Sequence, residues 1–264
     1  MRNSSGKAKA KGAAGEASSA TESRSKQAVP PQTDLAGSDR AELEVMLAAG
    51  EEILECYRVL KKAGLNVVGE ALKGQGEFVQ LNHYPKGDVF DHDTHSQFYY
   101  HAHRPDEHGH FHTFLRQKGM PAGIRPVPAA ATRDWPKGDD ALSHIVAISM
   151  DRYGYPVGLF TTNRWVTAET WYAARDVCAM VDRFAIDHAY PSWPVNRWLT
   201  AMVRLFRPQI KSLLFERDAR LRAWEVEHPS SDVFEDRGLE LMSELPVDVE
   251  RQIRAVRAAL AARV

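Results

Sequence analysis

The sequence predicts an α+β fold, in which a central, mainly antiparallel sheet is joined to an N-terminal helix and a helical C-terminal third. Two observations predict it. Apolar and polar residues alternate in short runs between about residues 77 and 161, which is the periodicity of strands. Before and after that stretch, apolar residues recur at helical spacing. Strands in the middle with helices at both ends favour α+β over a doubly wound parallel sheet.

We expect residues 1–37 to form a disordered tail and residues 38–264 to form a single α+β domain. The tail consists mainly of small and charged residues and contains almost no bulky apolar side chain. Burial of so little apolar surface cannot offset the entropy that ordering would remove. Ser38 is a suitable N-cap for the first predicted helix, and Gly64 is a suitable end for it.

Five strands are predicted in the sheet region, about residues 77–161. They are Glu77–Tyr84, Phe98–His103, Gly109–Arg116, Ser143–Met150 and Tyr155–Thr161. Pro85, Gly87 and the aspartates that follow predict a long loop through Gln97. Pro105 and Asp106 suit a type I turn between the second and third strands. Turns this short connect antiparallel neighbours.

Helices are predicted again over residues 167–262. A long helix is expected from Thr167 through His188, because apolar residues keep a helical period until Pro191 and Pro194 interrupt it. Further helices are expected at about residues 195–206, 208–227, 233–243 and 247–262.

Composition limits the classes of function. The chain carries 34 basic and 35 acidic residues, so its net charge gives no general attraction to nucleic acid or to an anionic membrane. Cys56 and Cys178 are far apart and suit reduced thiols in a cytosol better than a secreted disulfide framework. No apolar run approaches the length that crosses a bilayer. We expect a cytoplasmic protein whose partner is a small-molecule substrate or ligand, and the oligomeric state is left open.

Histidines are concentrated in one part of the chain, where eight of the 11 lie between residues 83 and 112. Five of them occupy alternating positions, namely His101, His103, His108, His110 and His112. A strand turns alternate side chains to one face, so a hairpin would gather these imidazoles on one surface. A two-residue turn places His101 opposite His110, whereas a wider turn places His103 opposite His112.

This pattern predicts a metal site. Imidazoles on neighbouring strands are close enough to share one ion, and a mononuclear centre takes three or four protein ligands. The preferred ligands are His101, His103 and His110, with His112 as an alternate. Zinc and non-haem iron both suit such ligands, so the identity of the divalent metal is left open.

Carboxylates and a phenol near the histidines are candidates for catalysis. The proton-transfer candidates are Asp88, Asp91, Glu107 and Tyr99. A further metal ligand is expected from Glu107 or from the loop residues Asp88, Asp91, His92 and His95, which could equally orient the imidazoles.

The segment His101-Ala-His103-Arg-Pro-Asp-Glu107 resembles the HxHxxxE metal motif of cupins. The likeness is partial: His95 stands where the cupin pattern begins with glycine, and no second cupin motif follows.

A wider resemblance covers most of the chain after residue 40. Its segments are His83-Tyr-Pro-Lys-Gly-Asp88, Tyr99-Tyr-His-Ala-His103-Arg and Glu107-His-Gly-His-Phe-His112. They resemble a bacterial family of hypothetical proteins classed only as a domain of unknown function. This resemblance implies one domain and a bacterial source, and it implies no activity.

The leading hypothesis is a metal-dependent enzyme that acts on an unidentified small molecule. Zinc would indicate a hydrolase or lyase, and iron would indicate an oxygenase. The alternatives are a non-catalytic metal or small-molecule binding protein, and an interaction protein with a structural histidine face. His144 and His188 lie on apolar patterns and are expected to be core histidines rather than ligands.

Overall fold

The computed structural model describes residues 35–104 and 107–263. Most of the tail that is predicted to be disordered therefore lies outside the described residues, as do Pro105 and Asp106. Leu35, at the end of that tail, is buried, and its carbonyl accepts hydrogen bonds from Ser38 N at 3.1 Å and from Arg263 Nη2 at 3.1 Å.

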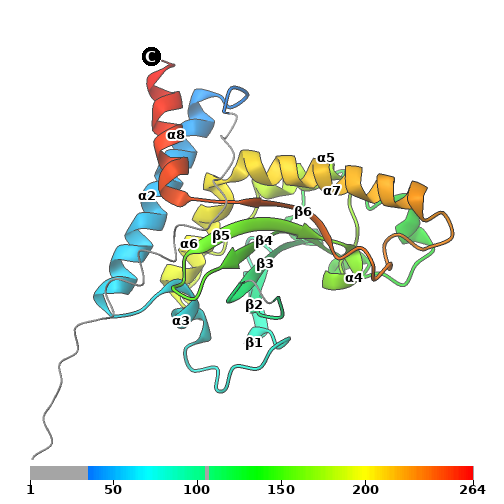
Figure 1. The fold of residues 1–264 in the computed structure, drawn as a ribbon, viewed down its shortest axis with the longest axis horizontal. Coiled ribbons are helices and arrows are strands. Elements are labelled where there is room, and N and C mark those ends of the chain that lie inside the picture. The colour runs from blue at the N-terminus through cyan, green and yellow to red at the C-terminus, as the bar shows by residue number, and fades with distance from the viewer. Residues whose placement is uncertain (1–34, 105–106, 264) are drawn as a thin grey trace, which may run out of the picture.

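The described strands form one antiparallel sheet in which each strand pairs with the next in sequence. The strands are β1 Tyr84–Phe90, β2 Ser96–His101, β3 Gly109–Arg116, β4 Leu142–Met150, β5 Pro156–Thr162 and β6 Leu241–Pro246. This six-stranded meander and the helices on both sides of it in sequence confirm the predicted α+β class (Figure 1).

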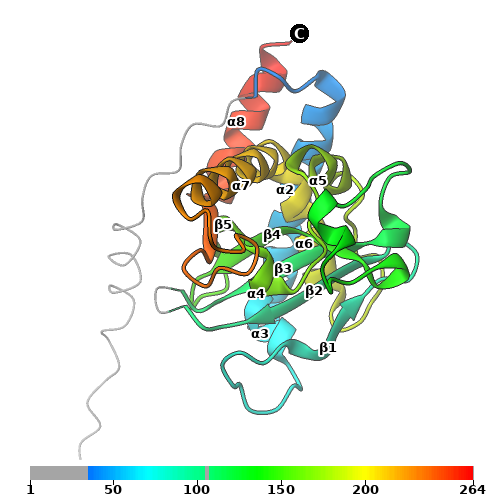
Figure 2. The ribbon, with the colours of Figure 1, turned by 90° about the vertical axis from the view of Figure 1, so that its right-hand side faces the viewer.

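The helices gather at one end of the sheet and on one of its faces, except for the one-turn helix α4, which lies near the opposite end of the sheet (Figure 1). They are α2 Arg40–Lys62, α3 Val67–Leu72, α4 Arg164–Thr167, α5 Ala174–Val181, α6 Trp193–Leu205, α7 Arg207–Glu227 and α8 Val249–Ala261. Helices α5 and α7 lie side by side along the sheet, and α2 packs against both α6 and α8 (Figures 1 and 2). None of the described helices is long and apolar enough to cross a membrane.

The two faces of the sheet differ in chemistry. On one face, Phe98 and Phe111 join the main apolar core, and the ring of Phe111 lies 5.7 Å from that of Trp198 on α6. Strand alternation turns the neighbouring residues His110 and His112 to the opposite face. The helices thus support the sheet from one side, and the histidines occupy the other.

The first predicted strand, Glu77–Tyr84, is wrong. Leu81 has a positive φ of 69° and is 69% exposed, so this segment is a turn-rich connection. The strand begins at Tyr84 and includes Pro85 and Gly87, which predicted a loop. Pro85 is tolerated there because β1 is an edge strand, whose outer backbone groups need no ladder partner.

Two predicted helices are also wrong. In place of the long helix Thr167–His188, a helix forms only over α5, because Ala168 takes a left-handed conformation and Thr170 bonds to the carbonyl of Leu142 at 2.9 Å. In place of a helix over residues 233–243, β6 completes the sheet beside β5. In both places, pairing with the sheet overrides a local helical pattern.

The first helix begins one residue later than predicted. Asp39, rather than Ser38, is its N-cap, since Glu42 N donates to Asp39 Oδ1 at 2.8 Å and Asp39 N donates to Glu42 Oε2 at 3.1 Å. This reciprocal pair is a capping box.

Candidate metal centre

Three buried histidines converge on the face of the sheet opposite the helices. His101 on β2 is paired directly with His110 on β3, which is the register that a two-residue turn predicts. Their Nε2 atoms lie 2.7 Å apart. The ring of His112 lies 4.8 Å from that of His110 and 5.1 Å from that of His101. One nitrogen from each ring lies within 4.8 Å of the others, so the three could hold a metal ion.

Burial keeps these imidazoles neutral. His110 and His112 are fully buried and His101 is 7% exposed. Desolvation, together with the neighbouring His110, lowers the pKa of His101 to about 2. Desolvation likewise lowers the pKa of His110 and holds that of His112 well below its usual range. A neutral imidazole is the form that binds metal.

Glu107 fixes the orientation of His110. Burial opposes ionisation of Glu107, but its hydrogen bond with His110 helps to hold the pKa of the carboxyl below its usual range. An ionised carboxylate only accepts hydrogen bonds, so His110 Nδ1 donates to Glu107 Oε1. The lone pair of neutral His110 is therefore on Nε2, the nitrogen that faces His101. A carboxylate behind an imidazole in this way is a common partner of metal-ligating histidines.

Two ring nitrogens in this group have no hydrogen-bond partner among the described residues. They are His101 Nδ1 and His112 Nε2, and both are buried. A buried nitrogen without a partner is costly, because it gives up hydrogen bonds to water and receives nothing in return. A metal ion with imidazole ligands would remove that cost, so the donor set fits a metal.

A second buried pair supports His112 from the neighbouring strand. His112 Nδ1 lies 3.0 Å from His144 Nε2 on β4. The backbone N–H of His144 donates to Glu169 Oε2 at 2.6 Å, and Thr167 Oγ1 donates to Glu169 Oε1 at 3.2 Å. Desolvation lowers the pKa of His144 to about 3 and raises that of Glu169 to about 7.

The remaining alternating histidines are placed differently. His103 is half-buried, and its ring lies 5.0 Å from that of His101 and 5.1 Å from that of His110, but it lies outside the group whose nitrogens converge. His108 does not join the other imidazoles on their face, because β3 begins only at Gly109. Its Nδ1 instead lies 2.7 Å from Tyr100 Oη, on the side of the sheet that faces the helices.

Two of the four proton-transfer candidates adjoin the three histidines. Glu107 contacts His110, and the ring of Tyr99 lies 5.2 Å from that of His101 and 5.1 Å from that of His112. Tyr99 is also covered by the ring of His83, which is parallel to it at 3.6 Å.

The two aspartates are engaged elsewhere. Asp88 accepts a hydrogen bond from Gln97 Nε2 at 2.6 Å and contacts His83 Nδ1 at 3.0 Å, so it reaches the histidines only through His83. Asp91 accepts from the backbone N–H groups of Asp93, Thr94 and Asp187 at 2.6–2.9 Å. Its carboxylate ties the turn between β1 and β2 to the segment that follows α5.

The loop histidines that were candidates for a fourth ligand also lie away from the three histidines. His92 and His95 line a separate surface pocket with Phe90 and Arg116.

Sequence reasoning missed the roles of His144 and Glu169. His144 is a satisfied core histidine, as expected, but the group that satisfies it is His112. No sequence signal shows this, because a bulge between Thr113 and Phe114 sets which residue of β4 faces His112. Glu169 lies 25 residues beyond His144 in sequence, in a segment predicted to be helical.

A pocket of about 330 Å³ adjoins the site through Glu107 and Phe160, although none of the three histidines lines it. Glu107 and Ser149 lie in its wall, so the carboxylate that orients His110 also faces this space. The guanidinium of Arg104 lies 4.6 Å above the ring of Phe160, another wall residue, and that ring is 5.1 Å from the ring of His110.

A family model described as "Domain of unknown function (DUF6969)" matches residues 47–247, which is most of the chain. The chain belongs to this family. The DUF6969 match contains all six strands, all three converging histidines, and His144 and Glu169 behind them. No curated protein and no solved structure matches the chain.

The cupin resemblance finds no support in the structure. A cupin is a double-sheet jelly roll built from two Greek keys, whereas the described strands form one sheet in sequential order. The HxHxxxE spacing brings Glu107 to His110, because the turn folds β3 back beside β2.

Proposed function

We propose that this protein is a metal-dependent enzyme that binds Zn²⁺ or Fe²⁺ through His101, His110 and His112 and acts on a small molecule. The observation that carries the proposal is the hydrogen bonding of the three rings. Glu107 orients His110, His144 orients His112, and two buried ring nitrogens have no hydrogen-bond partner in the part of the chain that the structure describes. Rings that were buried only for packing would not need two polar supports and would not leave two nitrogens unsatisfied.

The pocket beside Glu107 supports an enzyme rather than a closed structural site. Its volume, about 330 Å³, is at the lower end of the range for ligand pockets. When bound, the metal would polarise a substrate oxygen or activate a water molecule. The carboxylate of Glu107 is a proton acceptor in the wall of the pocket, and the phenol of Tyr99 lies beside His101 and His112. Asp88 is a weaker candidate for proton transfer, because it reaches the histidines only through His83. Asp91 is weaker still, because its carboxylate is engaged elsewhere.

The chemistry depends on which metal binds. Three imidazoles suit zinc and non-haem iron equally well, with zinc favouring hydrolysis or lyase chemistry and iron favouring oxygenation. His103, whose ring lies 5.0 Å from that of His101, is the proposed additional ligand or the residue that replaces His112.

The alternative function is a protein that binds a metal without catalysis. The near-complete burial of all three rings favours it, because a catalytic metal needs a position that substrate can reach. A further proposal, on localisation, rests on thiol chemistry. We place the protein in the cytosol, where the free thiols of Cys56 and Cys178 would stay reduced.

Metal content tests the proposal directly. Untagged protein is purified and its metals are measured by mass spectrometry, with a His101→Ala/His110→Ala double variant beside it. The matched control is His92→Ala/His228→Ala, which removes two histidines that lie outside the three converging rings. We expect close to one Zn or Fe per chain in the wild type and in the control, and none in the double variant. Metal-free wild type whose affinity for added Zn²⁺ and Fe²⁺ equals that of the double variant would overturn the proposal.

A second experiment separates an enzyme from a non-catalytic binder. The protein is loaded with Co²⁺, whose visible spectrum reports its coordination, and azide is added as a small anion. If the cobalt ion has a coordination position that azide can reach, azide should change the cobalt bands. If the site is closed, the bands should stay unchanged. A change that is lost when Phe160→Trp fills the neighbouring pocket would place the open position on that side.

A further inference from the structure

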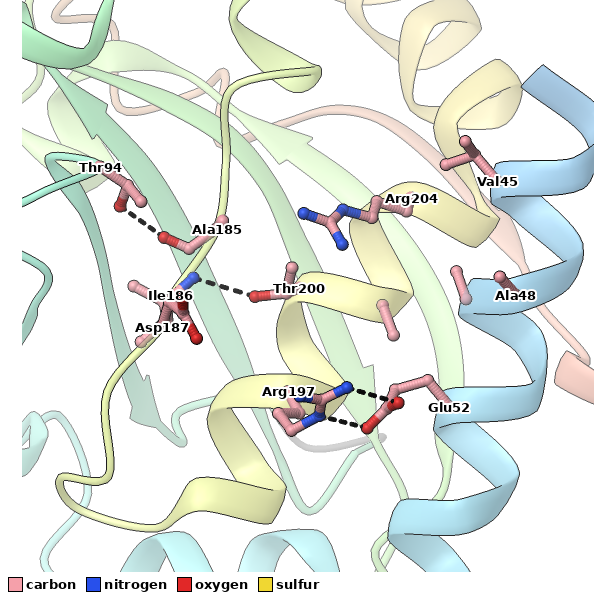
Figure 3. Close-up of a pocket in the computed structure, with 12 residues that line it drawn as sticks. Val45, Ala48, Glu52, Thr94, Ala185, Ile186, Asp187, Arg197, Thr200 and Arg204 are labelled. Atoms are coloured by element: carbon pink, nitrogen blue, oxygen red, sulfur yellow. Dashed lines mark hydrogen bonds and ion pairs between the residues drawn. The ribbon is translucent and has the colours of Figure 1, made fainter. Parts of the chain in front are cut away.

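A second pocket lies on the helix side of the sheet, away from the histidines. Its volume is about 470 Å³, and it is lined by residues of α2, α6, the turn after β1 and the segment 185–187 (Figure 3). This size is within the range of ligand pockets. Val45, Ala48 and Ala49 form an apolar wall on α2.

Most polar groups in this pocket already have partners. Arg197 and Glu52 form a two-pronged ion pair between α6 and α2, with Nη2 and Oε2 2.6 Å apart. Thr200 Oγ1 accepts from Ile186 N at 2.9 Å, and Thr94 Oγ1 donates to Ala185 O at 2.5 Å. These bonds, drawn in Figure 3, fix the walls relative to one another.

Two oppositely charged side chains in the pocket, Arg204 and Asp187, make no hydrogen bond or ion pair with a described residue, although the charge of Asp187 also attracts the guanidinium of Arg197. Arg204 extends from α6 toward Ala185 and Ile186 (Figure 3). The backbone at Asp187 is fixed, because its N–H donates to Asp91 Oδ2 at 2.6 Å.

The charge balance of the pocket selects the ligand class. Glu52 and Arg197 neutralise each other, and Arg204 and Asp187 add one positive and one negative charge. A phosphate or a simple carboxylate would gain attraction from Arg204 and lose it to repulsion by Asp187. A ligand that carries both charges satisfies both residues, and an aliphatic group on it would contact the wall on α2.

We propose that this pocket binds a small zwitterion of the α-amino acid type with an aliphatic side chain. Arg204 binds its carboxylate, Asp187 binds its ammonium group, and Val45, Ala48 and Ala49 contact its side chain. This inference is independent of the metal proposal, because the pocket and the histidines lie on opposite faces of the sheet.

Calorimetric titration of the full chain with L-leucine tests the inference. Three variants are compared with the wild type: Arg204→Gln, Asp187→Asn, and the control Arg222→Gln, which changes an exposed arginine of α7 outside the pocket. The side chains of Arg204 and Asp187 are exposed and make no hydrogen bond or ion pair with a described residue, so we expect their replacement to leave the fold intact, and circular dichroism checks this. We expect each pocket variant to weaken leucine binding at least about tenfold and the control to leave it unchanged.

Two leucine derivatives assign each charge. N-acetyl-L-leucine lacks the ammonium group, so it should bind weakly to the wild type and lose nothing further in Asp187→Asn. L-leucinamide lacks the carboxylate, so it should bind weakly and lose nothing further in Arg204→Gln. Equal binding of L-leucine and N-acetyl-L-leucine would show a plain anion site and overturn the inference. The absence of binding by L-leucine and L-valine at up to about 10 mM would also overturn it.

Discussion

His144 Nε2 lies 3.0 Å from His112 Nδ1, so the third converging histidine is held from the next strand rather than from its own hairpin. The pair is fully buried, and water cannot replace either partner. His144 therefore selects the ring orientation in which His112 Nε2 faces the other two histidines.

Replacement of His144 by Gln should weaken metal binding. The loss of a residue that orients a ligand costs about 10–100-fold in metal affinity. Competition with a chromophoric chelator measures the change, and His92→Gln on the surface is the control. An unchanged affinity in a folded His144→Gln protein would show that His112 does not depend on this support.

Gly109→Ala should disturb the centre through the hairpin. A Cβ at Gly109 would lie 2.6 Å from the backbone oxygen of His101 and 2.5 Å from Tyr100 Oη. The strands must separate to admit it, which moves His110 relative to His101. We expect lower metal affinity and a lower melting temperature, while Gly37→Ala, where a Cβ meets nothing within 4 Å, should change neither. Wild-type metal affinity in Gly109→Ala would contradict this.

Acid should destabilise the metal-free protein through His101. The pKa of His101 is about 2 in the folded state, because burial disfavours its charge, and it returns to 6.5 on unfolding. The unfolded chain thus binds a proton below pH 6.5 that the folded chain refuses. As far as His101 is concerned, the free energy of unfolding is constant above pH 6.5 and falls by about 1.4 kcal/mol per pH unit below it. Urea unfolding at several pH values should show a shallower fall in His101→Gln, and parallel slopes would exclude this histidine as a cause.

Ionisation of Glu169 should make stability depend on pH in the opposite direction. Burial raises the pKa of Glu169 from 4.5 to about 7. Between these values the unfolded chain releases a proton that the folded chain retains, so stability is lost as the pH rises from 4.5 to 7. Glu169→Gln cannot ionise and keeps an acceptor for His144 N. Its stability relative to wild type should therefore increase by about 1.4 kcal/mol per pH unit in this window. Urea unfolding at about pH 5 and about pH 8 tests this, and an identical difference at both pH values would refute it.

Asp91→Ala should destabilise the fold and leave metal affinity unchanged. The carboxylate of Asp91 is buried and accepts three backbone hydrogen bonds, and a hydrogen bond to a charged group contributes about 1.5–3 kcal/mol. Asp93→Ala removes an exposed carboxylate from the same turn and serves as the control. A catalytic role for Asp91 would require the reverse result, with activity lost and stability retained.

The hairpin that carries the histidines was the most predictable part of the fold. Alternation predicted strand β3 at its observed bounds, and the pairing of His101 with His110 is one of the two registers that the turn left open. Both signals are local, because strand parity and turn length involve only neighbouring residues.

The parts that could not be predicted depend on distant segments. The segment of β6 has a local helical pattern and becomes a strand only because β5 offers it a partner. The same limit applies within the site. The contact between His112 and His144 depends on a bulge that the sequence does not mark, and Glu169 reaches His144 from beyond the next strand.

All three converging histidines lie between residues 101 and 112, within one hairpin. A metal bound there closes a short loop, so it restricts the unfolded chain far less than a link between distant segments would. The sheet and the helices on its other face do not depend on that link for their connection. Loss of the metal should therefore empty the centre without dismantling the protein, and chelation and reloading should be reversible.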